Sequence, residues 1–242
     1  MLVDDEGVCL TQRTQPRMTL VVPRFEGENL VVEAPGMPPL RMATWFGAGD
    51  WIAVKIWRDE LRLPHPERAS SEWFSDFLGQ RCRLVHLPDA VARPVEAPFD
   101  RAPWRVSLAD SFPLLLIGQA SLDQLNQRLQ APVTMGRFRP NLVIAGSEAH
   151  EEDGWRTVCS GEVELSIAKP CMRCAIPLID PLTAETGCEP LRTLATYRRK
   201  PDSSKVLFGQ KAVVVKGGLL RAGNAVEAGN NQDLESVTVG KA

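Results

Sequence analysis

Short apolar runs separated by polar turns make up the first part of the chain. The run Trp51–Trp57 is rich in aromatic and β-branched residues, which predicts a mostly buried strand. Leu30–Glu33 predicts another strand, because it directly follows the turn-like sequence Glu26–Asn29. Two further runs are expected to form short strands: Met18–Val22 and Arg83–Leu87.

One helix is predicted between these strands. Four apolar side chains recur at the spacing of one helical face: Trp73, Phe74, Phe77 and Leu78. Ser70 or Ser71 is placed to cap the start of this helix, and Gly79 is placed to end it.

The second part of the chain again combines strand and helix signals. Strands are predicted at Phe112–Ile117, Leu142–Ala145 and Glu162–Ile167. Ser121 and Gln124 have the spacing of a capping box, and three leucines then line one helical face: Leu122, Leu125 and Leu129.

Proline and glycine mark two more elements near the end. Pro190 suits the first turn of a short helix that includes Leu191, Leu194 and Tyr197. Gly217-Gly218 lies between two apolar runs within Ala212–Leu220, which predicts a hairpin.

A proline-rich stretch at 88–103 divides the chain and predicts a linker or a long surface connection. We therefore expect a first domain at residues 1–90, a second at 91–228, and a polar, disordered tail at 229–242. Many short strands with a few short helices predict an α+β fold that is mostly β and barrel-like.

Composition narrows the functional classes. The chain has 242 residues, with 28 basic and 30 acidic side chains and a formal net charge of −2. A dominant basic surface for nucleic acid is therefore not expected. No stretch approaches the roughly 18 apolar residues of a membrane helix, and the acidic run Asp4–Glu6 is unlike a signal peptide. We expect a cytoplasmic protein with no membrane partner.

Cys171 and Cys174 are the cysteines that form a motif. Two thiols three positions apart are able to converge on one soft metal ion, and Arg173 between them favours the thiolate form. Three other interpretations stay open. A structural zinc site with Cys188 as a third ligand needs a fourth ligand, a thioredoxin-like disulfide needs a helix at the first cysteine, and the pair is otherwise two inert, buried thiols.

Two more segments have polar side chains suited to a ligand. Arg139 and Asn141 offer a guanidinium fork and an amide on either side of the stiff Pro140, although a surface loop would look the same. Asp110 and Ser111 are placed either to bind a polar ligand or to cap a turn before the next strand.

These segments occur in an order that resembles the MOSC-domain family of molybdenum-cofactor proteins. The matching segments are Asp110–Pro113, Ala120–Asn126, Arg137–Asn141, Pro170–Cys174, Tyr197-Arg198 and Leu207–Gln210. Residues 1–13 resemble the N-terminal β-barrel domain that precedes MOSC in the amidoxime-reducing components and in bacterial MOSC reductases. The resemblance implies a β-barrel-like MOSC domain after a partial N-terminal barrel, because in relatives a first strand and a lysine-serine segment precede the part that matches residue 1.

The resemblance also implies roles for individual residues. Cys174 would be the catalytic thiolate ligand of molybdenum, whereas Cys171 would not be a ligand. The cofactor molybdopterin would be contacted by six residues: Asp110, Ser111, Arg139, Asn141, Met172 and Arg173. Tyr197, Arg198 and Gln210 are candidates for the substrate pocket, and no pyridoxal phosphate site is expected.

The implied activity is the reduction of N-hydroxylated compounds, such as amidoximes and hydroxylamines. Because no cysteine follows Cys188, an iron–sulfur domain like that of some bacterial relatives is not expected. Electrons would come from a separate flavin reductase or ferredoxin. The alternatives are a non-catalytic module that binds the cofactor or carries sulfur, and a truncated, inactive relative.

Overall fold

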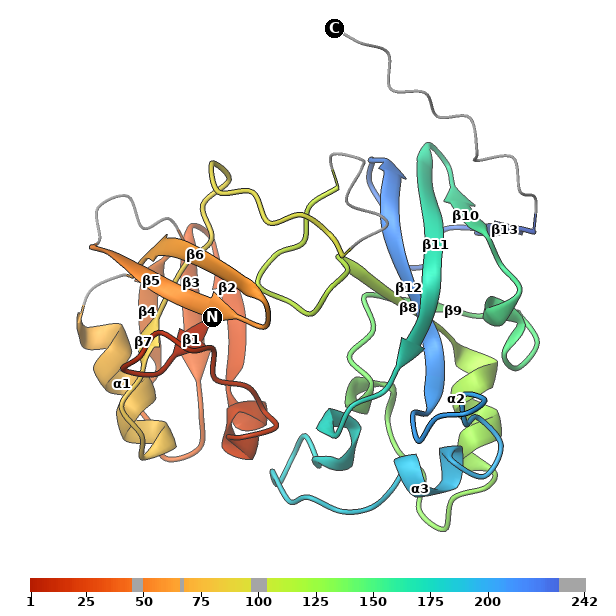
Figure 1. Ribbon diagram of the computed structural model, residues 1–242, viewed down its shortest axis with the longest axis horizontal. Coiled ribbons are helices and arrows are strands. Elements are labelled where there is room, and N and C mark those ends of the chain that lie inside the picture. Colours follow the sequence, from red (N-terminus) through yellow and green to blue (C-terminus); the bar gives the residue numbers. More distant parts are fainter. Residues whose placement is uncertain (45–49, 66–67, 97–103, 231–242) are drawn as a thin grey trace, which may run out of the picture. The chain divides into compact units, whose positions relative to one another are not determined.

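The computed structural model describes residues 1–44, 50–65, 68–96 and 104–230 (Figure 1). The chain divides into two compact units. The first contains Met1–Arg93 and Ala175–Cys188, and the second contains Pro94–Cys174 and Glu189–Ala242. The chain therefore leaves the second unit directly after Cys174 and returns to it at Glu189.

Small antiparallel sheets form the first unit. In the first sheet, β1 (Leu2–Val3) pairs with β7 (Arg83–Leu84). The second sheet contains three strands: β2 (Val22–Glu26), β3 (Asn29–Glu33) and β4 (Leu40–Ala43). In the third, β5 (Trp51–Ile56) pairs with β6 (Asp59–Pro64). The turn between β2 and β3 contains Gly27 at φ +59°, a conformation that glycine adopts without steric cost. This sequence therefore favours a tight hairpin.

Helix α1 (Arg68–Leu78) supplies the core of the first unit. Its apolar face, which includes Trp73 and Phe77, packs with Leu2 and Val32 from the strands. The rings of Trp73 and Phe74 meet edge to face with centroids 5.0 Å apart. The described residues of this unit also form the 3₁₀ helices η1 (Pro16–Leu20) and η5 (Ile176–Leu178).

The described part of the second unit forms a six-stranded sheet with the order β13-β10-β11-β12-β8-β9. The strands are β8 (Leu114–Gly118), β9 (Leu142–Ile144), β10 (Thr157–Ser160), β11 (Val163–Met172), β12 (Leu207–Lys216) and β13 (Glu227–Gly229). Between them lie α2 (Gln119–Asn126), α3 (Leu191–Leu194), η3 (Met135–Arg137) and η4 (Glu151–Asp153). β8 and β9 are parallel, with α2 in the connection that parallel strands require. The predicted class, α+β and mostly β, is confirmed.

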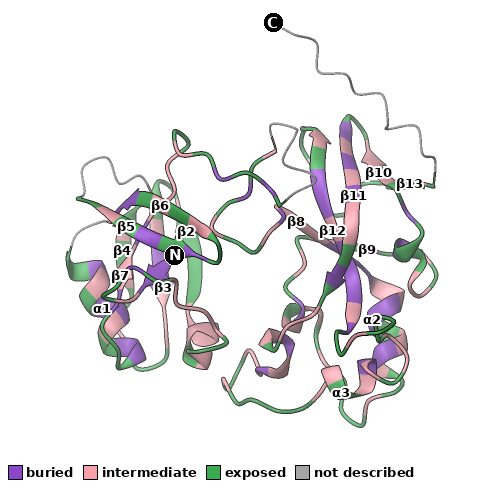
Figure 2. Cartoon of the chain, in the orientation of Figure 1, coloured by how far each residue is buried: buried purple, intermediate pink, exposed green. Residues whose placement is uncertain are grey.

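Buried residues lie along the central strands of this sheet (Figure 2), and two core clusters pack on its two faces. Adjacent residues in a strand point to opposite faces. Leu116 belongs to one core cluster, with Trp155 and Leu165, whereas Ile117 belongs to another, with Leu125 and Phe208. Burial on both faces explains why β8 is apolar without alternation.

Several predicted strands are confirmed with shifted ends, but two predictions in the first unit are wrong. Most of Met18–Val22 lies in η1 and not in a strand. β5 is not mostly buried, because only one of its faces packs: Val54 is 3% exposed and Trp51 is 46% exposed.

The predicted serine caps are also wrong. Ser70 and Ser71 lie inside α1, while Gly79, at φ +65°, follows its last residue as predicted. Ser121 lies inside α2, whose N-cap is Gly118. The hydroxyl of Ser121 instead donates to Glu152, 2.8 Å away and distant in the sequence, so the local pattern was misleading.

The predicted hairpin at Gly217-Gly218 does not form. β12 ends at Lys216, its last residues pair with β11, and residues 217–220 form no strand that returns along β12. Parts of the predicted proline-rich linker are packed, since Arg93 is 3% exposed and Val95 is 2% exposed. Residues 97–103, and 231–242 of the predicted tail, lie outside the described residues.

A matched pair of glycine substitutions tests the packing of β12. Gly209 has φ +78°, and a Cβ there would lie 2.7 Å from the Leu116 carbonyl oxygen and 2.6 Å from Cγ1 of Ile117. Gly161 has φ +59° but nothing within 4 Å. We expect Gly209→Ala to lower the free energy of unfolding by about 1–3 kcal/mol more than Gly161→Ala, measured by chemical denaturation. Equal losses would show that the close approach has no energetic role.

Candidate functional site

The Cys171–Cys174 segment lies at the end of β11. Cys171 points into the structure and is 7% exposed, while Met172, on the opposite face, is 45% exposed. The backbone N–H of Arg173 then donates to the Val206 carbonyl oxygen at 2.8 Å, which extends the pairing with the β12 side. Cys174 follows at an intermediate level of exposure. The two thiols therefore lie in different environments, and Cys174 is the more accessible.

Arg173 links this segment to the 138–141 segment. Its Nη1 donates to Sγ of Cys171 at 3.3 Å, and its Nη2 donates to the Phe138 carbonyl oxygen at 2.9 Å. The guanidinium also lies 5.4 Å from the centroid of the Phe138 ring. The Nε atom is buried and has no hydrogen-bond partner among the described residues. Such an orphaned donor is uncommon and marks a place where a ligand or water is accommodated.

Arg139 and Asn141 have different environments. Arg139 has φ +54°, in the left-handed region, and is exposed. The backbone N–H of Asn141 donates to the Leu115 carbonyl oxygen at 2.8 Å, and its Oδ1 accepts from the Leu115 N–H at 2.9 Å. The amide oxygen of Asn141 is therefore already used to attach this segment to β8.

Asp110 and Ser111 both contact Lys211. Nζ of Lys211 donates to Oδ2 of Asp110 at 2.8 Å and to Oγ of Ser111 at 2.7 Å. Lys211 pairs with Leu115 across the sheet, and Leu115 holds Asn141. The fold thus brings Asp110, Ser111 and Asn141 to one row of the sheet, although they are far apart in the sequence.

A second ammonium group lies beside this row. Lys169 is paired with Lys211 in the β11–β12 ladder. Their Nζ atoms lie 5.0 and 5.6 Å from the centroid of the Phe112 ring. Lys169 donates to Glu96 at 2.5 Å, and this hydrogen bond is the largest cause that holds the pKa of Glu96 below its usual range. The negative charges of Glu96 and Asp110 reduce the electrostatic repulsion between the two ammonium groups.

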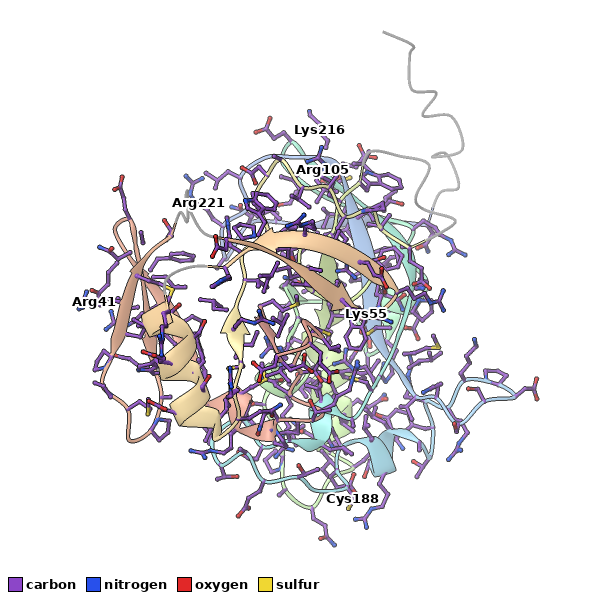
Figure 3. All side chains as sticks on the ribbon, turned by 60° about the vertical axis from the view of Figure 1, so that its left-hand side comes forward. Arg41, Lys55, Arg105, Cys188, Lys216 and Arg221 are labelled. Carbon is purple, nitrogen blue, oxygen red and sulfur yellow. The ribbon has the colours of Figure 1, made fainter. Side chains whose placement is uncertain are left out.

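The zinc and redox interpretations of the cysteine motif find no support. The described residues contain no group of three or more His, Cys, Asp or Glu side chains arranged to hold a metal ion. All six cysteines are free. Cys188 is exposed at the surface (Figure 3), and Cys171 lies in a strand instead of at the start of a helix.

The candidates for a substrate pocket prove to be largely internal. Gln210 is 1% exposed, and its Nε2 donates to Oδ1 of Asp153 at 2.7 Å. Arg198 donates from Nη2 to Oδ2 of the same carboxylate at 2.5 Å. Sequence reasoning missed Asp153, because an aspartate in an acidic run gives no signal of a distant partner.

Two rings next to this carboxylate have buried polar atoms. His150 and Tyr197 have ring centroids 5.9 Å apart, and Nδ1 of His150 and the hydroxyl of Tyr197 are buried without a partner among the described residues. Burial, followed by the positive charge of Arg198, lowers the pKa of His150. Burial likewise raises the pKa of Tyr197. Both side chains are therefore held in their neutral forms.

Comparisons with known proteins agree with this architecture. The family model described as "MOSC domain" matches residues 103–227, and the model described as "MOSC N-terminal beta barrel domain" matches residues 1–81. The chain belongs to the MOSC-domain family. The resemblance found in the sequence is thereby confirmed.

Curated members of the MOSC family match over most of the chain. "Mitochondrial amidoxime reducing component 2" of Rattus norvegicus is 34% identical over 245 residues, which cover 93% of this chain and 71% of the relative. "Mitochondrial amidoxime-reducing component 1" is 32% identical in Mus musculus and 31% in Homo sapiens, each over 93% of this chain and over 70% and 71% of the relative. No helix within the described residues is long and apolar enough to span a membrane.

The neutral state of His150 predicts a pH dependence of stability. Because its folded pKa is lowered, the unfolded ring binds a proton first as the pH falls below about 6.5. Stability from this residue is fully present above that pH and is lost as the pH falls toward the folded pKa. We expect the Tm of the wild type to fall more steeply between about pH 7.5 and about pH 5.5 than the Tm of His150→Gln. Parallel curves would contradict this prediction, and both proteins retain the other histidines.

Proposed function

We propose that this chain binds the molybdenum cofactor with the thiolate of Cys174 as a metal ligand and reduces N-hydroxylated compounds. The observation that supports the proposal most is the accessible Cys174 at the end of β11, next in sequence to the partly buried Arg173, in a chain whose relatives are named amidoxime-reducing components. Membership of the MOSC family supports the cofactor class.

The described residues suit a cofactor better than a bare metal ion. A metal held by protein alone needs three or four ligands, and the described residues contain no such cluster. The molybdenum cofactor brings two dithiolene sulfurs of its own, so that one thiolate from the protein suffices. The buried Nε of Arg173 next to Cys174 is a donor without an acceptor, which suits an electron-rich ligand.

Each predicted contact residue has a role that its environment permits. Arg139 is exposed, and its guanidinium is suited to the phosphate of the cofactor. Asn141 would act through its amide Nδ2, because Leu115 occupies its Oδ1. Asp110 and Ser111 would act together with Lys211, whose ammonium group they hold. Met172, exposed beside the segment, would contact the pterin.

The overall reaction is a two-electron reduction. An N-hydroxylated amidine or amine takes up two electrons and two protons, the N–O bond breaks, and the products are the amidine or amine and water. When bound, the cofactor supplies the two-electron couple. The chain would hold the metal through Cys174 and keep the segment in place through Arg173.

Electrons would come from a separate flavin reductase or ferredoxin. The expected cytoplasmic location stays a prediction, since the names of the relatives describe mitochondrial proteins.

Replacement of Cys174 tests the proposal. We expect Cys174→Ala to lose molybdenum and to reduce an aromatic amidoxime at least about tenfold more slowly, because the thiolate ligand is missing. Molybdenum is measured by mass spectrometry on protein from a host that makes the cofactor, and turnover is measured with a chemical reductant. Cys188→Ala, which removes an exposed thiol, is the matched control and should resemble the wild type.

Three outcomes separate the alternatives. Full metal content and turnover in Cys174→Ala would overturn the proposal. Molybdenum in the wild type without reduction, under several electron donors, would favour a non-catalytic cofactor or sulfur-carrier module. Absence of molybdenum from the wild type would favour an inactive relative.

A further inference from the structure

The carboxylate of Asp153 connects two side chains from different elements of the second unit. Asp153 ends η4, and its two oxygens accept from Nη2 of Arg198 at 2.5 Å and from Nε2 of Gln210 at 2.7 Å. Gln210 belongs to β12, and Arg198 follows α3. The side chains are 34% exposed for Asp153 and 15% for Arg198, and Gln210 is 1% exposed. A mostly buried guanidinium that pairs with one carboxylate among the described residues depends strongly on that partner.

Arg198 in turn holds the beginning of β12. Its Nε donates to the Leu207 carbonyl oxygen at 3.3 Å, and its own carbonyl oxygen accepts from the Leu207 N–H at 2.9 Å. The next residue, Arg199, forms a bridge with Val206. Val206 and Leu207 are therefore attached on this side to the 198–199 segment.

The other side of the same two residues holds the cysteine segment. Leu207 pairs with Met172, and the Val206 carbonyl oxygen accepts from the Arg173 N–H at 2.8 Å. Val206 and Leu207 thus lie between Arg198 and the residues that precede Cys174. A shift of Arg198 would be transmitted through two backbone hydrogen bonds.

We infer that Asp153, acting through Arg198 and Gln210, is the positioning residue for Arg173 and Cys174. It is not one of the residues proposed to contact the metal or the cofactor. It holds the guanidinium of Arg198 in one direction, Arg198 holds Val206 and Leu207, and these two residues hold the end of β11. Supporting groups of this kind orient the residues that do the chemistry. The catalytic consequence rests on the proposed function, but the structural consequence does not.

Two variants and two matched controls test this inference. Asp153→Asn keeps an oxygen for Gln210 but removes the charge that faces Arg198. Arg198→Lys keeps the charge but removes the Nε donor to Leu207. Asp123→Asn is the control for the first variant, because Asp123 also accepts from a glutamine, at 2.8 Å, but is exposed. Arg221→Lys, at an exposed arginine (Figure 3), is the control for the second.

The first measurement is the rate at which iodoacetamide labels Cys171 in protein without cofactor, read by peptide mass spectrometry. We expect Asp153→Asn and Arg198→Lys to label Cys171 about fivefold or more faster than the wild type, since the end of β11 opens locally. Cys82, 4% exposed in the first unit, reports general unfolding in the same sample and should not change. Unchanged labelling of Cys171, or an equal rise in Asp123→Asn, would overturn the inference.

The second measurement is amidoxime reduction per bound molybdenum. We expect kcat to fall about tenfold in both variants with little change in KM, and Tm to stay close to that of the controls. A fall in proportion to Tm, or a change in KM alone, would indicate a general structural role and contradict positioning. If the wild type neither binds molybdenum nor reduces the substrate, the proposed function fails, whereas the labelling rates still decide the inference about Asp153.

Discussion

The pairing of β11 with β12 is the interaction on which the second unit depends. These two ten-residue strands lie in the middle of the six-stranded sheet and join its two halves. Their register shifts between Glu164 and Leu165, between Ile167 and Lys169, and between Pro170 and Met172. Irregularities of this kind bend a strand and redirect its side chains. The last shift lies directly before Arg173 and Cys174, so the sheet itself decides where the cysteine segment points.

Arg173 connects the end of β11 to the other segments of the candidate site. Its guanidinium reaches the Phe138 carbonyl oxygen and Sγ of Cys171, and so fixes the segment that contains Arg139 against the end of β11. Two N–H groups of this partly buried guanidinium have acceptors in these segments, which offsets part of the cost of taking the charge out of water. The remaining Nε donor lacks one among the described residues. The same side chain therefore contributes both to folding and to the affinity of the site for a ligand.

The formal net charge of −2 does not describe how charged side chains are arranged locally. Lys169 and Lys211 flank the Phe112 ring and are matched by Glu96 and Asp110. Arg198 is matched by Asp153. Paired charges of this kind add little to stability when exposed, but they hold long side chains in defined places. The exposed Arg139, by contrast, is available to an anion.

The sequence by itself determined the fold class, several strands, the helix face at Trp73 and Phe77, and the order of motifs that indicated the MOSC family. These features depend on local periodicity or on residues that stay close in the chain. Only the tertiary structure decided that Ser121 donates to Glu152 instead of capping α2, that Gln210 is buried, and that Asp153 pairs with Arg198. Their partners lie tens of residues away, and a hydrogen bond between distant residues leaves no periodic signal in either segment. Long-range pairing of the strands brings such groups together, which is why the candidate site could be named from the sequence while its support could not.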